Sequence, residues 1–193
     1  MKKFPFSSIK RSLHSHIKPI VFSILGLLFF APAQAQLLAG KTNALLWANV
    51  TPNFSLELVT SEHTSLSGSL FYSPKHTTTD ISMKGCDLQL RYWFSGRALA
   101  QSFLALGLQG MKHDVNAFSD YVHDGFSTGP GLVYGYDLPL TKRFNLEFTA
   151  GVSIMWYREK KYGKQEQAPY EYNHTGKKLM PMGIGISCVY IFK

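Results

Sequence analysis

Residues 144–157 read FNLEFTAGVSIMWY, a stretch in which apolar side chains alternate with small or polar ones. Successive side chains of a β-strand point to opposite faces, so this period of two predicts a long strand with two unlike faces. Residues 132–138 alternate in the same way, and the short segment 139–143 separates the two stretches. The pattern therefore predicts an antiparallel hairpin.

The same alternation recurs along the chain and gives eight candidate strands. They lie around residues 41–48, 54–59, 65–72, 87–94, 104–109, 131–138, 144–157 and 182–192. Tight turns are expected at 61–64, 95–98 and 139–143, and longer polar stretches at 73–85, 113–127 and 158–178. In an antiparallel meander, alternate connections lie at opposite ends, so we expect short turns at one end and long loops at the other.

The first 35 residues have the pattern of a secretory signal peptide. A basic start is followed by an apolar run at residues 20–30 and by Ala33-Gln34-Ala35, a small-x-small cleavage pattern. Cleavage after Ala35 leaves one mature domain at residues 36–193. The signal carries five of the 20 Lys and Arg residues and none of the 12 acids, so the net charge falls from +8 to +3. This weak charge does not indicate a nucleic-acid partner.

The composition of the two strand faces favours one class of barrel. The face opposite the apolar one is rich in Gly, Ser, Ala and Thr and poor in Lys, which suits a crowded interior better than a water-facing surface. Aromatic residues also lie toward strand ends, as at Tyr72, Phe94, Trp156 and Phe192. Apart from the signal, no apolar run is long enough for a membrane-spanning helix. We therefore expect an eight-stranded antiparallel up-and-down transmembrane β-barrel, with a soluble barrel as the alternative. In a membrane such a sheet must close, because an open edge would leave backbone groups unpaired.

Several short motifs carry a family resemblance. They are Lys41-Thr42-Asn43, Leu45-Leu46-Trp47-Ala48, Thr51-Pro52-Asn53, Arg91-Tyr92-Trp93, residues 142–147 and residues 185–190. In their order and spacing, the chain resembles the domain-of-unknown-function family 3575, outer-membrane β-barrel proteins of Gram-negative bacteria. The resemblance implies location in the bacterial cell outer membrane, contact with outer-membrane lipid and the barrel-insertion machinery, and an envelope or fimbrial protein as partner. It supplies no catalytic residues.

Strand parity places a polar set of both charge signs inside the expected barrel. The set consists of Glu57, Asp87, Gln89, Arg91, Gln109, Asp137 and Glu147. An eight-stranded barrel is wide enough only for side chains or one small ligand. We interpret this set as an internal polar network that holds the barrel rigid, and a narrow ion path remains the alternative.

Cationic and aromatic residues alternate in the last long polar stretch. They are Arg158, Lys160, Lys161, Tyr162, Lys164, Tyr170 and Tyr172. Such side chains can bind phosphates or an acidic partner by charge pairing and stacking. The stretch is therefore a candidate partner site, with an ordinary solvated loop as the alternative.

Catalytic and metal chemistry have weaker support in the sequence. His113, Asp114, His123, Asp124 and Ser127 could form a Ser-His-acid set of a lipid-acting barrel enzyme, but their spacing matches no mechanistic motif. No two histidines have a metal-ligand spacing, so no cofactor is expected. Cys86 and Cys188 lie on the fourth and eighth strands with apolar parity, which predicts free thiols. The expected function is a non-enzymatic envelope barrel that binds or assists a partner through its loops.

Overall fold

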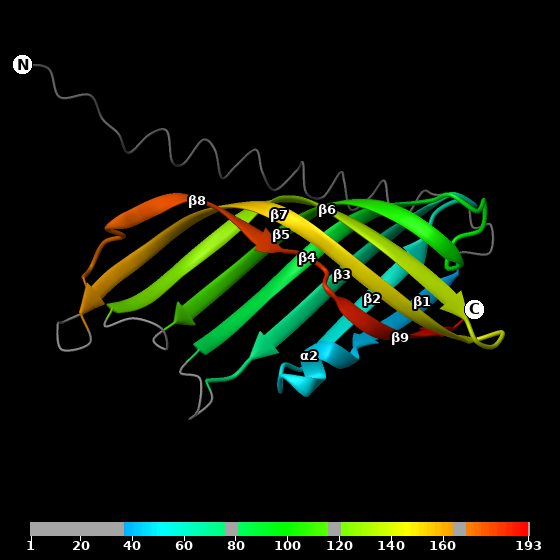
Figure 1. Ribbon diagram of the computed structural model, residues 1–193, viewed down its shortest axis with the longest axis horizontal. Coiled ribbons are helices and arrows are strands. Elements are labelled where there is room, and N and C mark those ends of the chain that lie inside the picture. Colours follow the sequence, from blue (N-terminus) through cyan, green and yellow to red (C-terminus); the bar gives the residue numbers. More distant parts are fainter. Residues whose placement is uncertain (1–36, 76–80, 116–120, 164–168, 193) are drawn as a thin grey trace, which may run out of the picture. The chain divides into compact units, whose positions relative to one another are not determined.

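The computed structural model describes residues 37–75, 81–115, 121–163 and 169–192. The expected signal peptide and its cleavage site lie outside these residues. The described residues form nine strands and one short helix (Figure 1). These are β1 (Leu38–Asn43), α2 (Ala44–Ala48), β2 (Asn53–Val59), β3 (Thr64–Ser73), β4 (Ile81–Trp93), β5 (Gln101–Val115), β6 (Tyr121–Pro139), β7 (Phe144–Gly163), β8 (His174–Pro181) and β9 (Gly185–Ile191). No helix in this described part is long and apolar enough to cross a membrane.

The strands form one antiparallel sheet that closes on itself. Each strand from β1 to β7 pairs with the next along the chain, and β9 pairs with β1. One edge of β7 pairs with β6, while its other edge pairs with β9 along Phe144–Thr149 and with β8 along Val152–Glu159. Strands β8 and β9 therefore share the eighth position of the ring. The all-β, antiparallel, up-and-down prediction is confirmed, and we call this closed sheet the barrel.

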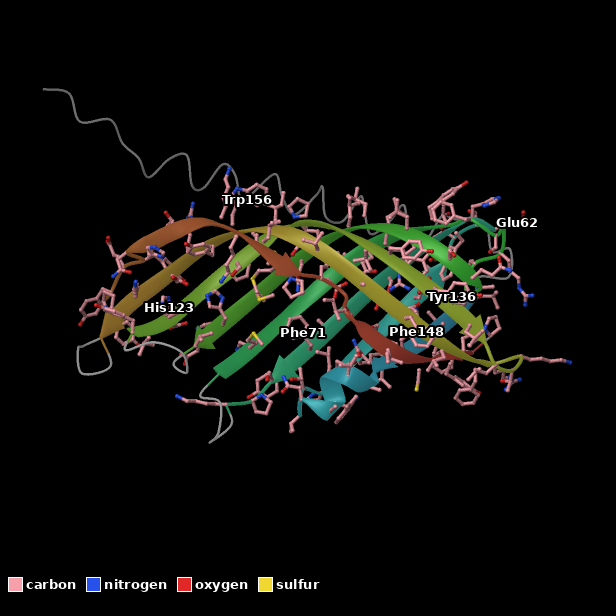
Figure 2. The ribbon with its side chains drawn as sticks, viewed as in Figure 1. Glu62, Phe71, His123, Tyr136, Phe148 and Trp156 are labelled. Atoms are coloured by element: carbon pink, nitrogen blue, oxygen red, sulfur yellow. The ribbon has the colours of Figure 1, made fainter. Side chains whose placement is uncertain are left out.

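Apolar side chains cover the outside of the barrel, and many charged and polar side chains are buried inside it. Leu88, Leu106 and Leu132 are 58%, 60% and 53% exposed, and Trp156 also lies on the outer face (Figure 2). By contrast, Glu57 on the inner face is fully buried. This distribution is the reverse of that in a soluble domain, where apolar residues are the ones most often buried.

The first expected strand, at residues 41–48, was wrong over its second half. β1 ends at Asn43, and residues 44–48 form α2 instead. The side chain of Asn43 accepts hydrogen bonds from the backbone N–H groups of Leu45 (3.0 Å) and Leu46 (3.4 Å). A side-chain oxygen that caps the first turn in this way favours the start of a helix. The Ala, Leu and Trp residues that follow are compatible with a helix as well as with a strand.

The three long polar stretches are shorter as loops than predicted. β4 begins at Ile81, β5 reaches Val115, and β7 continues to Gly163 before β8 begins at His174. The expected loops therefore contain strand residues over much of their length. The prediction relied on polar composition and was wrong at these positions. A strand can keep its hydrogen-bonded pairing beyond the point where its outer face stops being apolar.

The last expected strand is interrupted at Gly183, which has a positive φ of 60°. The register to β7 changes there by one residue, from Val152↔Pro181 to Thr149↔Gly185. An extra residue in one strand is a β-bulge, and glycine suits its backbone conformation. Met182 consequently lies inside and is 1% exposed, although its sequence parity predicted the outer face.

One end of the barrel interior holds an apolar core. Trp93 and Phe103 are fully buried and lie with their ring centroids 4.6 Å apart. The turn between β4 and β5 lies against this core, where Leu99 is 3% exposed and its carbonyl accepts a 2.7 Å hydrogen bond from Asn145. Alternation places Trp93 on the inner face, but the sequence did not predict an apolar core, because small and polar residues dominate that face.

Candidate functional site

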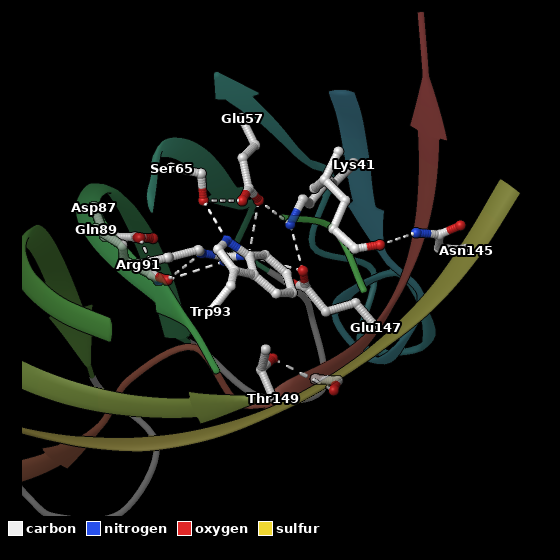
Figure 3. A network of polar contacts seen from close by, with 12 residues as sticks. Lys41, Glu57, Ser65, Asp87, Gln89, Arg91, Trp93, Asn145, Glu147 and Thr149 are labelled. Carbon is white, nitrogen blue, oxygen red and sulfur yellow. Dashed lines mark hydrogen bonds and ion pairs between the residues drawn. The ribbon is translucent and has the colours of Figure 1, made fainter. Parts of the chain in front are cut away.

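Two cations and two anions meet inside the barrel. They are Lys41 from β1, Glu57 from β2, Arg91 from β4 and Glu147 from β7 (Figure 3). All four have inner-face parity on their strands, so closure of the sheet brings them together from four different strands. We call these four residues the ion cluster.

Arg91 is the central donor of the ion cluster. Its Nη1 donates to Glu57 Oε2 at 2.9 Å and to Glu147 Oε2 at 2.7 Å. Its Nε and Nη2 donate to Gln89 Oε1 at 3.2 and 3.0 Å, and its guanidinium lies 4.5 Å from the centre of the Phe103 ring. Lys41 forms ion pairs with both glutamates.

The ion cluster is balanced in charge and almost entirely buried. Its side chains are 0–5% exposed, and each cation contacts both carboxylates. Burial of ions is costly unless each has a partner of opposite charge and further hydrogen bonds. Ser65 donates such a bond to Glu57 and accepts one of 2.8 Å from Trp93 Nε1. The cluster therefore links strands across the barrel interior.

Sequence reasoning missed Lys41 as a member of this network. It was assigned to the family motif, and the misplaced strand at 41–48 obscured its parity. A usable signal is present in the sequence, because the predicted interior set holds four acids and the single base Arg91, so a second cation is to be expected inside.

The other residues expected in the interior also lie inside the barrel, but they are not members of the ion cluster and differ in their hydrogen bonds. Gln89 donates a 2.8 Å hydrogen bond to Asp87, which also accepts one from Ser69. Gln109 accepts a 3.3 Å hydrogen bond from Ser153. Asp137 is fully buried, and neither of its carboxyl oxygens has a hydrogen-bond partner in the described structure.

Beside the ion cluster lies a cavity of about 260 Å³. Lys41, Arg91 and Glu147 border it at one end, together with Asp87 and Gln89. The rest of the lining mixes apolar side chains, three methionines among them, with Ser, Thr, Asn and Gln side chains. The cavity thus offers charged, polar and apolar groups together, a combination typical of sites for small ligands.

A second cluster surrounds Glu159, further along β7 than the aromatic residue Trp156. His123 Nδ1 and His174 Nδ1 lie 2.8 and 2.9 Å from Glu159 Oε1, and His113 Nε2 lies 3.4 Å from Oε2. Sequence spacing gave no sign of this cluster, because its members come from β5, β6, β7 and β8. Within the described residues no group has the arrangement of a metal site.

Charged side chains lie on the outer face of the barrel at the level of the Glu159 cluster. Lys112 and Asp124, for example, form an exposed pair at 3.6 Å. Burial acts to raise the pKa of Glu159, but hydrogen bonds with the three histidines outweigh it, and the pKa is lowered. Burial lowers the pKa of His113 below its ordinary value of 6.5, although the Glu159 hydrogen bond opposes this shift.

The residues considered for catalysis are only partly brought together. Ser127 Oγ lies 3.2 Å from His113 Nδ1, and His113 in turn contacts Glu159. Asp124 instead pairs with Lys112 on the outer face. Ser127 is fully buried, so its hydroxyl is not presented to a substrate at the surface.

The candidate partner site lies mainly on strands. Arg158, Lys160, Lys161 and Tyr162 belong to β7, while Tyr170 and Tyr172 lie in the connection to β8. Lys164 is outside the described residues. Arg158, Tyr170 and Tyr172 line an open recess on the barrel surface together with Trp156 and Lys177, whose Nζ lies 5.8 Å from the Trp156 ring centre.

Both cysteines are free and exposed, as predicted. Cys86 lies on β4 opposite Leu70 of β3, while Cys188 lies on β9 opposite Leu146 of β7. Their positions in the ring are four strands apart, which excludes a bridge without rearrangement of the sheet.

A closed antiparallel sheet with an apolar outer face and a buried, paired ion cluster inside defines a β-barrel protein. The chain belongs to the family described as "Protein of unknown function (DUF3575)", whose match covers residues 20–192. No curated protein and no solved structure matches it. The family assignment agrees with the resemblance noted in the sequence.

Proposed function

We propose that this chain is a non-enzymatic β-barrel of the bacterial outer membrane that binds a partner through the surface at its outer rim. The reversal of ordinary burial carries this proposal. Leucines and aromatic residues are exposed around the ring, while Lys41, Glu57, Arg91 and Glu147 are buried within it. Contact with lipid makes the exposure of these apolar side chains favourable. Mutual ion pairing lowers the cost of burying the four charged side chains.

We call the ring of exposed apolar side chains on the outer face the apolar belt, and it ends at identifiable residues toward each end of the barrel. Toward the long connections it ends near Trp156 and Phe126, beyond which Arg158 and Asp124 lie on the same outer faces. Tyr190 packs edge-to-face on Phe144 and on Phe192 near the opposite end, with centroid separations of 5.0 and 5.2 Å. Aromatic groups at both limits suit the two interfaces of a bilayer.

The recess beside Trp156 is the surface that we assign to the partner. It combines cations with exposed aromatic rings, among them Tyr170 and Tyr172. This chemistry suits an acidic segment of another envelope protein, and a fimbrial protein is the partner class that the family resemblance implies. We favour this function over a lipid-acting enzyme because Ser127 is buried, and over a channel because the four charges of the ion cluster are paired with one another across the interior.

Membrane insertion is tested by purification and flotation. The processed chain should require detergent, should float with liposomes in a density gradient, and should migrate differently on SDS gels before and after boiling. A dispersed, folded chain in detergent-free buffer would contradict the proposal.

Partner binding is tested in the intact envelope. A photo-crosslinking amino acid at Tyr172 should capture a defined protein, whereas the same group at Leu140, in the turn at the opposite end, should not. Equal capture at both positions would argue against a specific site in the recess.

A further inference from the structure

The barrel wall has an opening at its eighth position. β1 ends at Asn43, and after α2 the chain rejoins the sheet at Asn53. β8 pairs with β7, and its other edge has no strand partner among the described residues. Among the described residues, strand pairing therefore does not close the wall between β8 and the ends of β2 and β3 nearest α2, and we call this unpaired place the side opening.

Hydrogen bonds fix α2 at the edge of this opening. Asn43 Nδ2 donates to the carbonyl of Ile184 at 3.0 Å, and the backbone N–H of Asn43 donates to Asn53 Oδ1 at 2.7 Å. Trp47 Nε1 donates to Thr42 Oγ1 at 2.7 Å. These hydrogen bonds link the chain around α2 to β1, to β2 and to the residue just before β9. They hold α2 in place at the edge of the side opening.

The 260 Å³ cavity reaches the side opening. Its lining includes Leu46 of α2, Phe71 of β3 and Met180 of β8, which come from both borders of the opening. Leu70 and Ile184 also line it, although they are 65% and 52% exposed on the outer face. Because these two residues belong to both surfaces, the cavity is continuous with the outer apolar face of the barrel.

The inner end of the cavity carries one acid, Asp87, that is not a member of the ion cluster. Lys41 and Arg91 are each paired with Glu57 and Glu147, so their charges balance. Asp87 receives hydrogen bonds only from the neutral side chains of Ser69 and Gln89, and it has no ion pair in the described part of the chain. The charge surplus at this end is therefore negative.

We propose that the side opening admits a single-chain amphiphile with a protonated amine head. The ammonium group binds Asp87, and the hydrocarbon tail passes between Leu46 and Met180 into the surrounding lipid. Lys41 and Arg91 also line this end, but both are paired with Glu57 and Glu147, and Asp87 leaves the net charge there negative, which disfavours a carboxylate or phosphate head. This inference rests on the proposed membrane location, because the tail leaves the cavity at the level of the apolar belt.

Methionine methyl groups provide a direct measurement. Met83, Met111 and Met180 line the cavity, whereas Met155 is fully buried elsewhere in the barrel. The full processed chain, reconstituted in phosphatidylcholine nanodiscs with ¹³C-methyl methionine, is titrated with dodecylamine, dodecanol and dodecanoate. Dodecylamine should shift the three cavity methyl signals saturably and leave the Met155 signal unchanged, and dodecanoate should not.

Two substitutions test the head and tail sites. Asp87→Asn should weaken dodecylamine binding about tenfold, the loss expected for one charge-assisted hydrogen bond. Asp124→Asn makes the same charge change on the outer face and should leave binding unchanged. Met180→Trp should fill the opening and abolish the shifts at Met83 and Met111. Migration on unboiled SDS gels shows that each variant still folds.

The outcomes separate this inference from the proposed function. Equal binding of dodecanoate, or undiminished binding by Asp87→Asn, would overturn the amine specificity. Shifts at Met155 that match those at Met111 would show general partition into the bilayer and overturn the site. A chain that floats with liposomes yet shows no cavity shifts retains its membrane assignment and loses this ligand.

Discussion

Arg91 of β4 and Glu147 of β7 are joined across the barrel interior by a 2.7 Å hydrogen bond between Nη1 and Oε2. Two further strands, β5 and β6, lie between them along the sheet. The contact therefore depends on closure of the ring rather than on strand pairing. It makes the ion cluster a sensitive measure of whether the barrel is intact.

Glu147→Gln should destabilise the barrel by about 3–5 kcal/mol, because loss of one partner leaves buried cations uncompensated. Urea unfolding in detergent micelles, followed by tryptophan fluorescence, gives the free energy. Glu62→Gln, in the exposed turn between β2 and β3 (Figure 2), should change it by less than about 0.5 kcal/mol. Equal stability of the two variants would mean that the cluster contributes little.

Asp137→Asn should leave the stability unchanged or raise it by about 1–2 kcal/mol. The carboxyl group of Asp137 is buried without a hydrogen-bond partner, and replacement by a neutral amide lowers the cost of burial. The same urea titration measures the effect. A loss comparable to that of Glu147→Gln would show that Asp137 has a partner essential to folding.

Gly183→Ala should destabilise the barrel by about 1–2 kcal/mol. Gly183 has a φ of 60°, a conformation that costs an L-residue with a side chain this amount. Gly68, in the paired part of β3, lacks a positive φ and provides a control for loss of glycine flexibility. If Gly68→Ala costs as much as Gly183→Ala, the bulge conformation is not the cause.

Acidification should weaken the barrel in two steps. The lowered pKa of His113 means that the unfolded chain takes up a proton first, so stability falls as the pH drops below about 6.5. The lowered pKa of Glu159 adds a further loss as the pH falls below about 4.5, where the unfolded carboxylate becomes protonated.

Urea midpoints measured between about pH 7.5 and pH 5.5 check the first step. His113→Gln should reduce their dependence on pH, whereas His63→Gln, in an exposed turn at the other end, should leave it as in the wild type. If the urea midpoint of the His113→Gln variant changes with pH as much as that of the wild type, the pH dependence comes from other groups.

The period of two determined the strands of the barrel and most of their faces. It placed Glu57, Arg91 and Glu147 on inner faces and Leu106 and Trp156 on outer ones, because side-chain alternation is a local property of an extended backbone. The tight turns followed from local sequence in the same way. Cys86 and Cys188 were also correctly predicted as free, since strand order alone separates them.

Only the tertiary structure decided which interior groups meet. Lys41 joins the ion cluster, and the three histidines converge on Glu159, because ring closure brings distant strands together. Two local features of the backbone could not be predicted from the alternation of apolar and polar residues. The cap at Asn43 turned an expected strand into a helix, and the bulge at Gly183 moved Met182 to the inside. A single extra residue reverses every face beyond it, so parity holds only within an unbroken strand.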